Sequence, residues 1–414
     1  MKARISATKE SAAIIAAWFF LLQFSGPPSA RAYVLNYTVA DMRLPNAQSG
    51  GSACPRPNHF NSAVSGIVDR RWSISLGANP VTILTQDQSP DGRLNEIENL
   101  IQQSFASWTS VNGTTLTSTA LSPLTRTSMQ AACSSTDGLN TICLNQNDAL
   151  FTAGVLAFTR VVAADRIGET LPGRPPSAFI GEILDADILL RPNDANTTFA
   201  TPQALPSQPK AYDLESVLTH ELGHFFGFGH SGVWRAVMYP FAPPQGQFLG
   251  DRPTAQKPDA PLADDDRAGL RMLYPDPSDA LNVGSIRGRV LPANPLSLPT
   301  QPGGVTGLFG THVVAVDNAT GAVMAATMGG WSCTAAGPPQ FDGSYSLDRL
   351  PAGANRGYVI YVEPLDGPVD PGEVASTVAA LCHNVFTDPG WPAQFSCKVP
   401  EVATNFTTRT RPGP

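Results

Sequence analysis

Apolar residues recur at helical spacing in three segments of the chain. In the first they lie three and four positions apart after a turn at residues 89–92, and so form one helix face: Leu94, Ile97, Ile101, Phe105 and Trp108. A second helix is predicted from Leu214, with Asp213 as its N-cap. A third is predicted over 264–273, because three consecutive aspartates suit a helix N-terminus and Pro275 ends the pattern.

Short runs typical of strands accompany these helices. They cover residues 72–85, 141–144, 155–162 and 186–190. Residues 33–70 are rich in Gly, Pro and Ser and are expected to be irregular. This mixture of helices and strands predicts an α+β domain over residues 33–275.

The pattern changes after residue 275. Residues 276–283 are predicted to be a linker. Beyond them come short alternating strands separated by Gly and Pro: 285–291, 312–317, 344–347 and 358–362. Since no helical period is evident there, residues 284–414 are predicted to form an all-β sandwich. The length of 414 residues exceeds one hydrophobic core and agrees with two domains.

Charge argues against one class of partner. The formal net charge is −7, and Lys and Arg are scattered rather than clustered. Because phosphate binding needs clustered cations, we expect no nucleic-acid partner.

The first 32 residues have the features of a signal peptide. Lys2, Arg4 and Lys9 precede an apolar stretch over 12–24, and Ala30-Arg31-Ala32 fits an A-x-A cleavage site. This segment would direct export, followed by cleavage after Ala32. The alternative is an uncleaved anchor, but a bilayer span needs roughly 20 apolar residues and this stretch is shorter. No later stretch is long and apolar enough, so no membrane span is expected.

Six cysteines fit an oxidising compartment. Local pairing of Cys133 with Cys143 and of Cys382 with Cys397 is the simplest arrangement, which leaves Cys54 and Cys333 paired or free. Six cysteines allow 15 connectivities, and the other pairings stay open.

Residues 220–230, HELGHFFGFGH, carry the candidate chemistry. His220 and His224 lie one helical turn apart and can hold one ion, while Gly227 lets the chain turn so that His230 reaches the same point. Three imidazoles with an open fourth position favour a catalytic Zn²⁺. Glu221 adjoins a ligand and can act as general base and then acid. The alternative, half-buried histidines that only form hydrogen bonds, does not account for all five positions.

The motif HExxHxxGxxH resembles that of the matrixins among the metzincin metallopeptidases, and Ser231 follows it as in that family. The segment 231–240, SGVWRAVMYP, is similar to the matrixin run that places a methionine beneath the zinc. The resemblance implies that role for Met238, with Tyr239 near the primed-side pocket and Pro240 completing the run.

Two further segments extend this resemblance. Residues 262–274 are similar to the final matrixin helix, and 181–190 to the strand before the active-site helix in bacterial matrixins. The resemblance covers about 70–275 and implies a twisted mixed sheet with three helices.

Three features qualify the resemblance. The PRCGxPD zymogen segment is lacking, and a disulfide is favoured for Cys54. A second, structural zinc is not expected, because none of the remaining histidines lies in the region before the active-site helix where the resemblance would place its ligands: His59, His312 and His383. Asp185 or Asp187 could bind calcium, but solvated or capping carboxylates are the better expectation.

The tail resembles the carboxypeptidase regulatory-like, transthyretin-type sandwich, on a looser pattern of strands and turns. Its aromatic residues could bind a polymer surface, but core packing is the better expectation: Trp331, Tyr345 and Trp391.

Together these observations predict a secreted zinc endopeptidase that acts on proteins or peptides, with one zinc ion and a monomeric chain. The alternatives are an inactive secreted adhesion or binding protein and a peptidase of another metzincin family. Intact Glu221 argues against the first, and Ser231 with Met238-Tyr239-Pro240 against the second.

Overall fold

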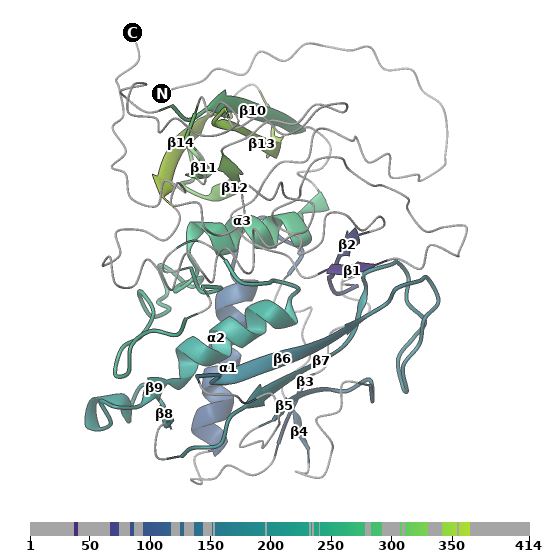
Figure 1. Ribbon diagram of the computed structural model, residues 1–414, viewed down its shortest axis with the longest axis vertical. Helices are drawn as coiled ribbons and strands as arrows, with labels where there is room; N and C mark the ends of the chain where they lie inside the picture. Colours follow the sequence, from purple (N-terminus) through teal and green to yellow (C-terminus); the bar gives the residue numbers. More distant parts are fainter. Residues whose placement is uncertain are drawn as a thin grey trace, which may run out of the picture.

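The computed structural model (Figure 1) describes seventeen stretches of the chain. They are residues 37–39, 67–73, 83–86, 94–116, 125–127, 136–143, 151, 154–194, 197–231, 233, 236–239, 241–277, 283–291, 307–308, 311–329, 342–353 and 356–364. The predicted signal segment 1–32 lies outside them.

A five-stranded mixed sheet forms one layer of the first domain. Its order is β4 (Thr125–Thr127), β3 (Ile83–Gln86), β5 (Asn140–Cys143), β7 (Ile183–Leu190) and β6 (Ala157–Ala163). The strands pair in parallel except for β6, which runs antiparallel to β7 at the edge. The predicted runs at 141–144, 155–162 and 186–190 are confirmed as strands, and the mixed sheet agrees with the expected α+β class. Of the predicted run at 72–85, residues 83–85 fall in β3, Trp72 and Ser73 are not in a strand, and 74–82 lie outside the described residues.

All three predicted helices are present: α1 (Leu94–Thr109), α2 (Leu214–Phe225) and α3 (Asp264–Leu273). Ile101, Phe105 and Trp108 on the predicted apolar face of α1 are buried, and Trp108 Nε1 donates to the carbonyl of Thr219 in α2 at 2.9 Å. Asp213 caps α2 as expected, because its side chain accepts from the Ser216 amide at 2.8 Å. Figure 1 shows α3 between this helical layer and the C-terminal strands.

Several short elements were not predicted. Strands β1 (Tyr37–Val39) and β2 (Ile67–Asp69) pair antiparallel, so residues 33–70 are not wholly irregular. Strands β8 (Phe199–Ala200) and β9 (Tyr212–Asp213) pair in parallel near a 3-10 turn at Leu205–Ser207. Two- and three-residue strands are too short to leave an alternating pattern, which explains why the sequence does not reveal them.

The C-terminal strands form two small sheets. One pairs β10 (Val283–Arg289) with β13 (Ser344–Pro351), and the other has the order β12 (Val323–Gly329), β11 (Thr311–Asp317), β14 (Tyr358–Pro364). The four predicted strands are found, but β12 was missed, and β10 begins at Val283, which the predicted linker had included. The sheets share a small apolar core: Val313, Ala315, Met324, Leu347, Leu350 and Tyr358. The transthyretin-type likeness stays a prediction.

The second face of the β12-β11-β14 sheet packs on the first domain. Val314, Val323 and Ala326 belong to the same buried cluster as Leu270 and Leu273 of α3. Strand alternation explains this, since odd- and even-numbered side chains of β11 point to opposite faces. The predicted boundary at 276–283 therefore does not separate two independent cores.

Two further expectations concern the covalent and membrane context. Cys143 is buried at the end of β5 and takes part in a disulfide. Its pairing with Cys133 and that of Cys382 with Cys397 stay predictions, because Cys133, Cys382 and Cys397 lie outside the described residues. Within the described stretches, no helix has the length and apolar character needed to cross a membrane.

Candidate metal centre

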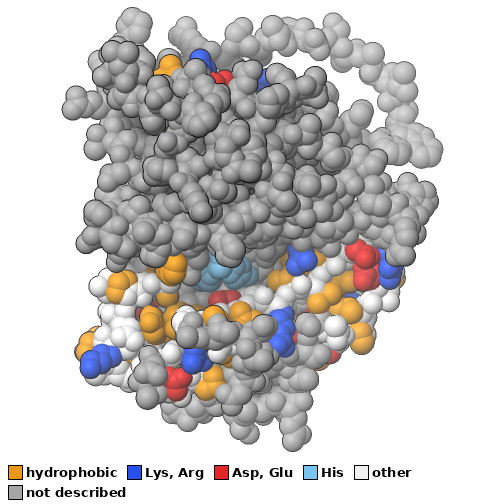
Figure 2. All heavy atoms as spheres, in the orientation of Figure 1, with side chains coloured by type: hydrophobic (Ala, Val, Ile, Leu, Met, Phe, Trp, Pro, Cys, Tyr) orange, Lys and Arg blue, Asp and Glu red, His pale blue; other side chains and the backbone are white. Residues whose placement is uncertain are grey.

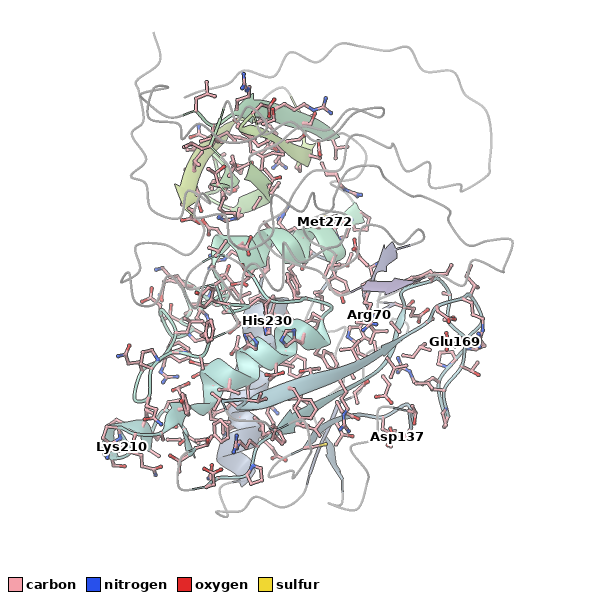
Figure 3. The ribbon with its side chains drawn as sticks, in the orientation of Figure 1. Arg70, Asp137, Glu169, Lys210, His230 and Met272 are labelled. Carbon is pink, nitrogen blue, oxygen red and sulfur yellow. The ribbon has the colours of Figure 1, made fainter. Side chains whose placement is uncertain are left out.

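The three predicted histidine ligands come together at the end of α2. His220 and His224 project from successive turns of the helix, and His230 returns from the loop that follows it. One ring nitrogen from each lies within 4.8 Å of the others. Figure 3 shows the His230 side chain close to α2, and in Figure 2 histidine side chains reach the surface beside an acidic group.

Gly227 makes this return possible. The α2 helix ends at Phe225, and Gly227 then adopts a φ of +105°, which is strained for residues with a side chain. A Cβ there would also lie 2.2 Å from the Arg70 carbonyl oxygen. The positive φ and the close approach of the Arg70 carbonyl both require glycine here, in agreement with the predicted turn at Gly227.

The hydrogen bonds of the rings select the form that binds metal. His220 Nδ1 lies 2.7 Å from the Val237 carbonyl, and His224 Nδ1 lies 2.8 Å from that of Phe228. Because a carbonyl only accepts, both Nδ1 atoms carry hydrogen and both Nε2 atoms keep a lone pair. Burial, with His224 nearby, lowers the pKa of His220 to about 3, and burial lowers the pKa of His224 and His230 too. Three neutral imidazoles fit zinc.

Glu221 lies beside the histidines with its carboxylate oriented. The Thr159 hydroxyl of β6 donates to Glu221 Oε2 at 2.7 Å and lies 3.0 Å from the Glu221 carbonyl oxygen. Burial raises the pKa of Glu221 to about 7, while the Thr159 hydrogen bond lowers it. The sequence predicts this strand but not the contact between Thr159 and Glu221. The one hint in the sequence is that Thr159 is a polar residue within an apolar run.

Met238 is fully buried below the histidine-bearing helix. A Cβ on Gly223 would lie 2.0 Å from Met238 Sδ, so the glycine between the histidines admits the methionine. The Ser231 amide donates to the Met238 carbonyl at 2.6 Å. Tyr239 is also buried, and Pro240 lies outside the described residues.

The N-terminus of α3 fixes the methionine turn. The Asp266 carboxylate accepts from the amides of Val237 and Ala263, each at 2.8 Å, and of Met238 at 3.2 Å. Since Val237 also accepts from His220, Asp266 supports a ligand as well as the methionine. The three aspartates were predicted only as favourable charges at a helix start.

Asp185 and Asp187 are fully buried in β7. They accept from the amides of Gly138 and Thr141, each at 2.9 Å. Burial raises the pKa of Asp185 to about 6 and that of Asp187, with Asp185 as a neighbour, to about 7. Calcium binding and the capping role at these two residues therefore both stay predictions.

Known proteins resemble the part of the chain that holds this centre. Residues 177–275 match the matrixin family model. Metalloendoproteinase 1 of Glycine max is 45% identical over 64 residues, and metalloendoproteinase 1-MMP of Arabidopsis thaliana is 39% identical over 99. These matches cover 16% and 21% of this chain and only 17% and 24% of the two relatives. The segment 177–275, which holds the three histidines, Glu221 and Met238, is therefore similar to the matrixins.

Proposed function

We propose that the chain is a secreted, zinc-dependent endopeptidase that hydrolyses peptide bonds in proteins. One observation carries the proposal: three neutral histidines converge within 4.8 Å next to the buried carboxylate of Glu221. The matrixin match of the same segment supports it, as do relatives named metalloendoproteinases. Residues 1–32 would direct export and be removed.

Zinc would be held by His220, His224 and His230. When bound, it supplies a Lewis acid that polarises the substrate carbonyl and acidifies the attacking water.

The residues of the chain perform the proton transfers. Glu221 takes a proton from the water as the water oxygen attacks the carbonyl carbon. It then gives this proton to the nitrogen that leaves when the C–N bond breaks. Thr159 holds one carboxylate oxygen of Glu221 in place. The Val237 carbonyl fixes the orientation of the His220 ring.

Strand β6 supplies a feature that suits an extended peptide. In the described sheet it pairs with β7 alone and also carries Thr159. An edge strand can add a peptide through backbone hydrogen bonds, which would bring the scissile bond toward Glu221. An oriented Glu221 favours an enzyme over an inactive binding protein.

The proposal predicts metal-dependent cleavage by the purified mature chain. We expect about one zinc per chain from the three-histidine site found among the described residues, and cleavage of a mixed peptide library at internal bonds. Metal content and product masses are the measurements. Chelation should abolish cleavage and added zinc restore it; a chain without zinc, or cleavage that survives chelation, would contradict the proposal.

Thr159→Val is predicted to lower kcat by about tenfold or more, because a hydrogen bond to a charged group contributes about 1.5–3 kcal/mol. KM and zinc content should stay near the wild-type values, since Thr159 orients Glu221 alone. Thr159→Ser keeps the hydroxyl and is the matched control. Equal losses of kcat in both variants would show that the hydroxyl does not matter.

A further inference from the structure

One histidine outside the metal centre is fully buried in the C-terminal sheet. His312 lies in β11, whose neighbouring positions are mostly apolar, and its side chain has no exposed surface. Its Nε2 lies 3.2 Å from Asp265 Oδ1, and its Nδ1 donates to Glu363 Oε1 at 2.7 Å. Glu363 is its cross-strand neighbour in β14, whereas Asp265 belongs to α3.

Asp265 links His312 to the segment that carries His230. It is fully buried, and its Oδ2 accepts a short hydrogen bond from the Ser231 hydroxyl. Ser231 directly follows His230, and its amide holds the Met238 carbonyl. One serine thus fixes both the segment of the third histidine and the methionine turn.

The charges make this arrangement depend on the C-terminal sheet. Burial lowers the pKa of His312, but the ion pair with Asp265 and the hydrogen bond and charge of Glu363 outweigh it and raise the pKa to about 9. His312 is therefore a cation at neutral pH. A buried carboxylate is costly without a cation, and His312 is the cation that reaches Asp265 in the described part of the chain.

We propose that the β12-β11-β14 sheet is a working part of the metal centre, in which His312 is a positioning residue that holds His230 in place through Asp265 and Ser231. The inference rests on the proposed zinc site, but not on peptide hydrolysis. The C-terminal strands then do more than accompany the peptidase segment, because they complete the support of one of its ligands.

A second contact at the same interface provides a control that distinguishes two roles of the sheet: positioning His230, or only packing against α3. The Tyr361 hydroxyl of β14 donates to Asp264, the residue before Asp265. This bond also attaches the sheet to α3, but Asp264 does not contact Ser231 in the described structure. Tyr361→Phe is therefore a matched control that weakens docking alone.

The first test measures zinc affinity of the full chain by competition with a chromogenic chelator. We expect His312→Gln to raise the zinc Kd about tenfold or more, as substitutions of groups that support metal ligands do. The Co²⁺-substituted chain should show a shifted visible spectrum. Tyr361→Phe should leave the Kd within about twofold and the spectrum unchanged. Equal Kd values for the two variants would overturn the inference.

The second test is a double-mutant cycle between His312→Gln and Ser231→Ala. If His312 acts through Ser231, the double variant has a zinc Kd close to that of the weaker-binding single variant; if their fold-changes multiply, the inference is wrong. If circular dichroism shows that His312→Gln does not fold, Glu363→Gln takes its place. We then expect the zinc Kd to rise at least threefold, and an unchanged Kd would overturn the inference. A wild-type chain that binds no zinc would instead reject the proposed metal centre itself.

Discussion

Replacing Glu221 by glutamine is expected to lower kcat for peptide cleavage by about 10³- to 10⁴-fold, near the upper range for loss of a general base. The amide has the shape of the carboxylate and can still accept from Thr159, but it cannot take a proton from water. Zinc content should remain at the wild-type value, because Glu221 lies outside the set of three converging histidines.

The measurements are kcat and KM on a fluorogenic peptide, together with zinc content. Glu215→Gln is the matched control, since Glu215 is also a buried glutamate of α2 but pairs with Arg252. It should lower the unfolding midpoint and leave kcat of the folded chain within about twofold. A Glu221→Gln variant that retains zinc and cleaves at the wild-type rate would exclude Glu221 as the base.

The parts of the site that the sequence predicts are those set by local geometry. The four-residue spacing of His220 and His224 places both on one side of α2. Asp213 caps that helix because a short acidic side chain at this position can accept from a free backbone amide of the first turn. The positive φ of Gly227 follows from the sharp return to His230. Each of these inferences needs only a few neighbouring residues.

The parts that it does not predict depend on packing between distant segments. Thr159 lies 62 positions before Glu221, and Ser231 lies 34 before Asp265. The aspartates of α3 suit a helix N-terminus in any context, so their charge pattern cannot reveal which of them reaches Ser231 or His312. Strand β12 was missed for a related reason, because its small residues, such as Ala325 and Ala326, give weak alternation.

Asp266→Ala is expected to destabilise the chain by about 3–5 kcal/mol, because it leaves the buried amides of Val237 and Met238 and the part-buried amide of Ala263 without their acceptor, at a cost of about 1–3 kcal/mol for each buried amide. The loss should also reach the metal centre. Val237 and Met238 form the turn below the histidines, and Val237 orients His220. Denaturant unfolding in the presence of a chelator measures the stability, and zinc competition measures the affinity.

Asp264→Ala is the control for this prediction, because it removes a carboxylate from the same end of α3. Asp264 is part-exposed and pairs with Arg267 and Tyr361, so its loss should cost only about 1 kcal/mol and leave the zinc affinity near wild type. If the two variants lose equal stability, the aspartates act through helix charge alone, as their position in the sequence suggests. If only Asp266→Ala weakens both folding and zinc binding, the start of α3 is the point where the fold supports the metal centre.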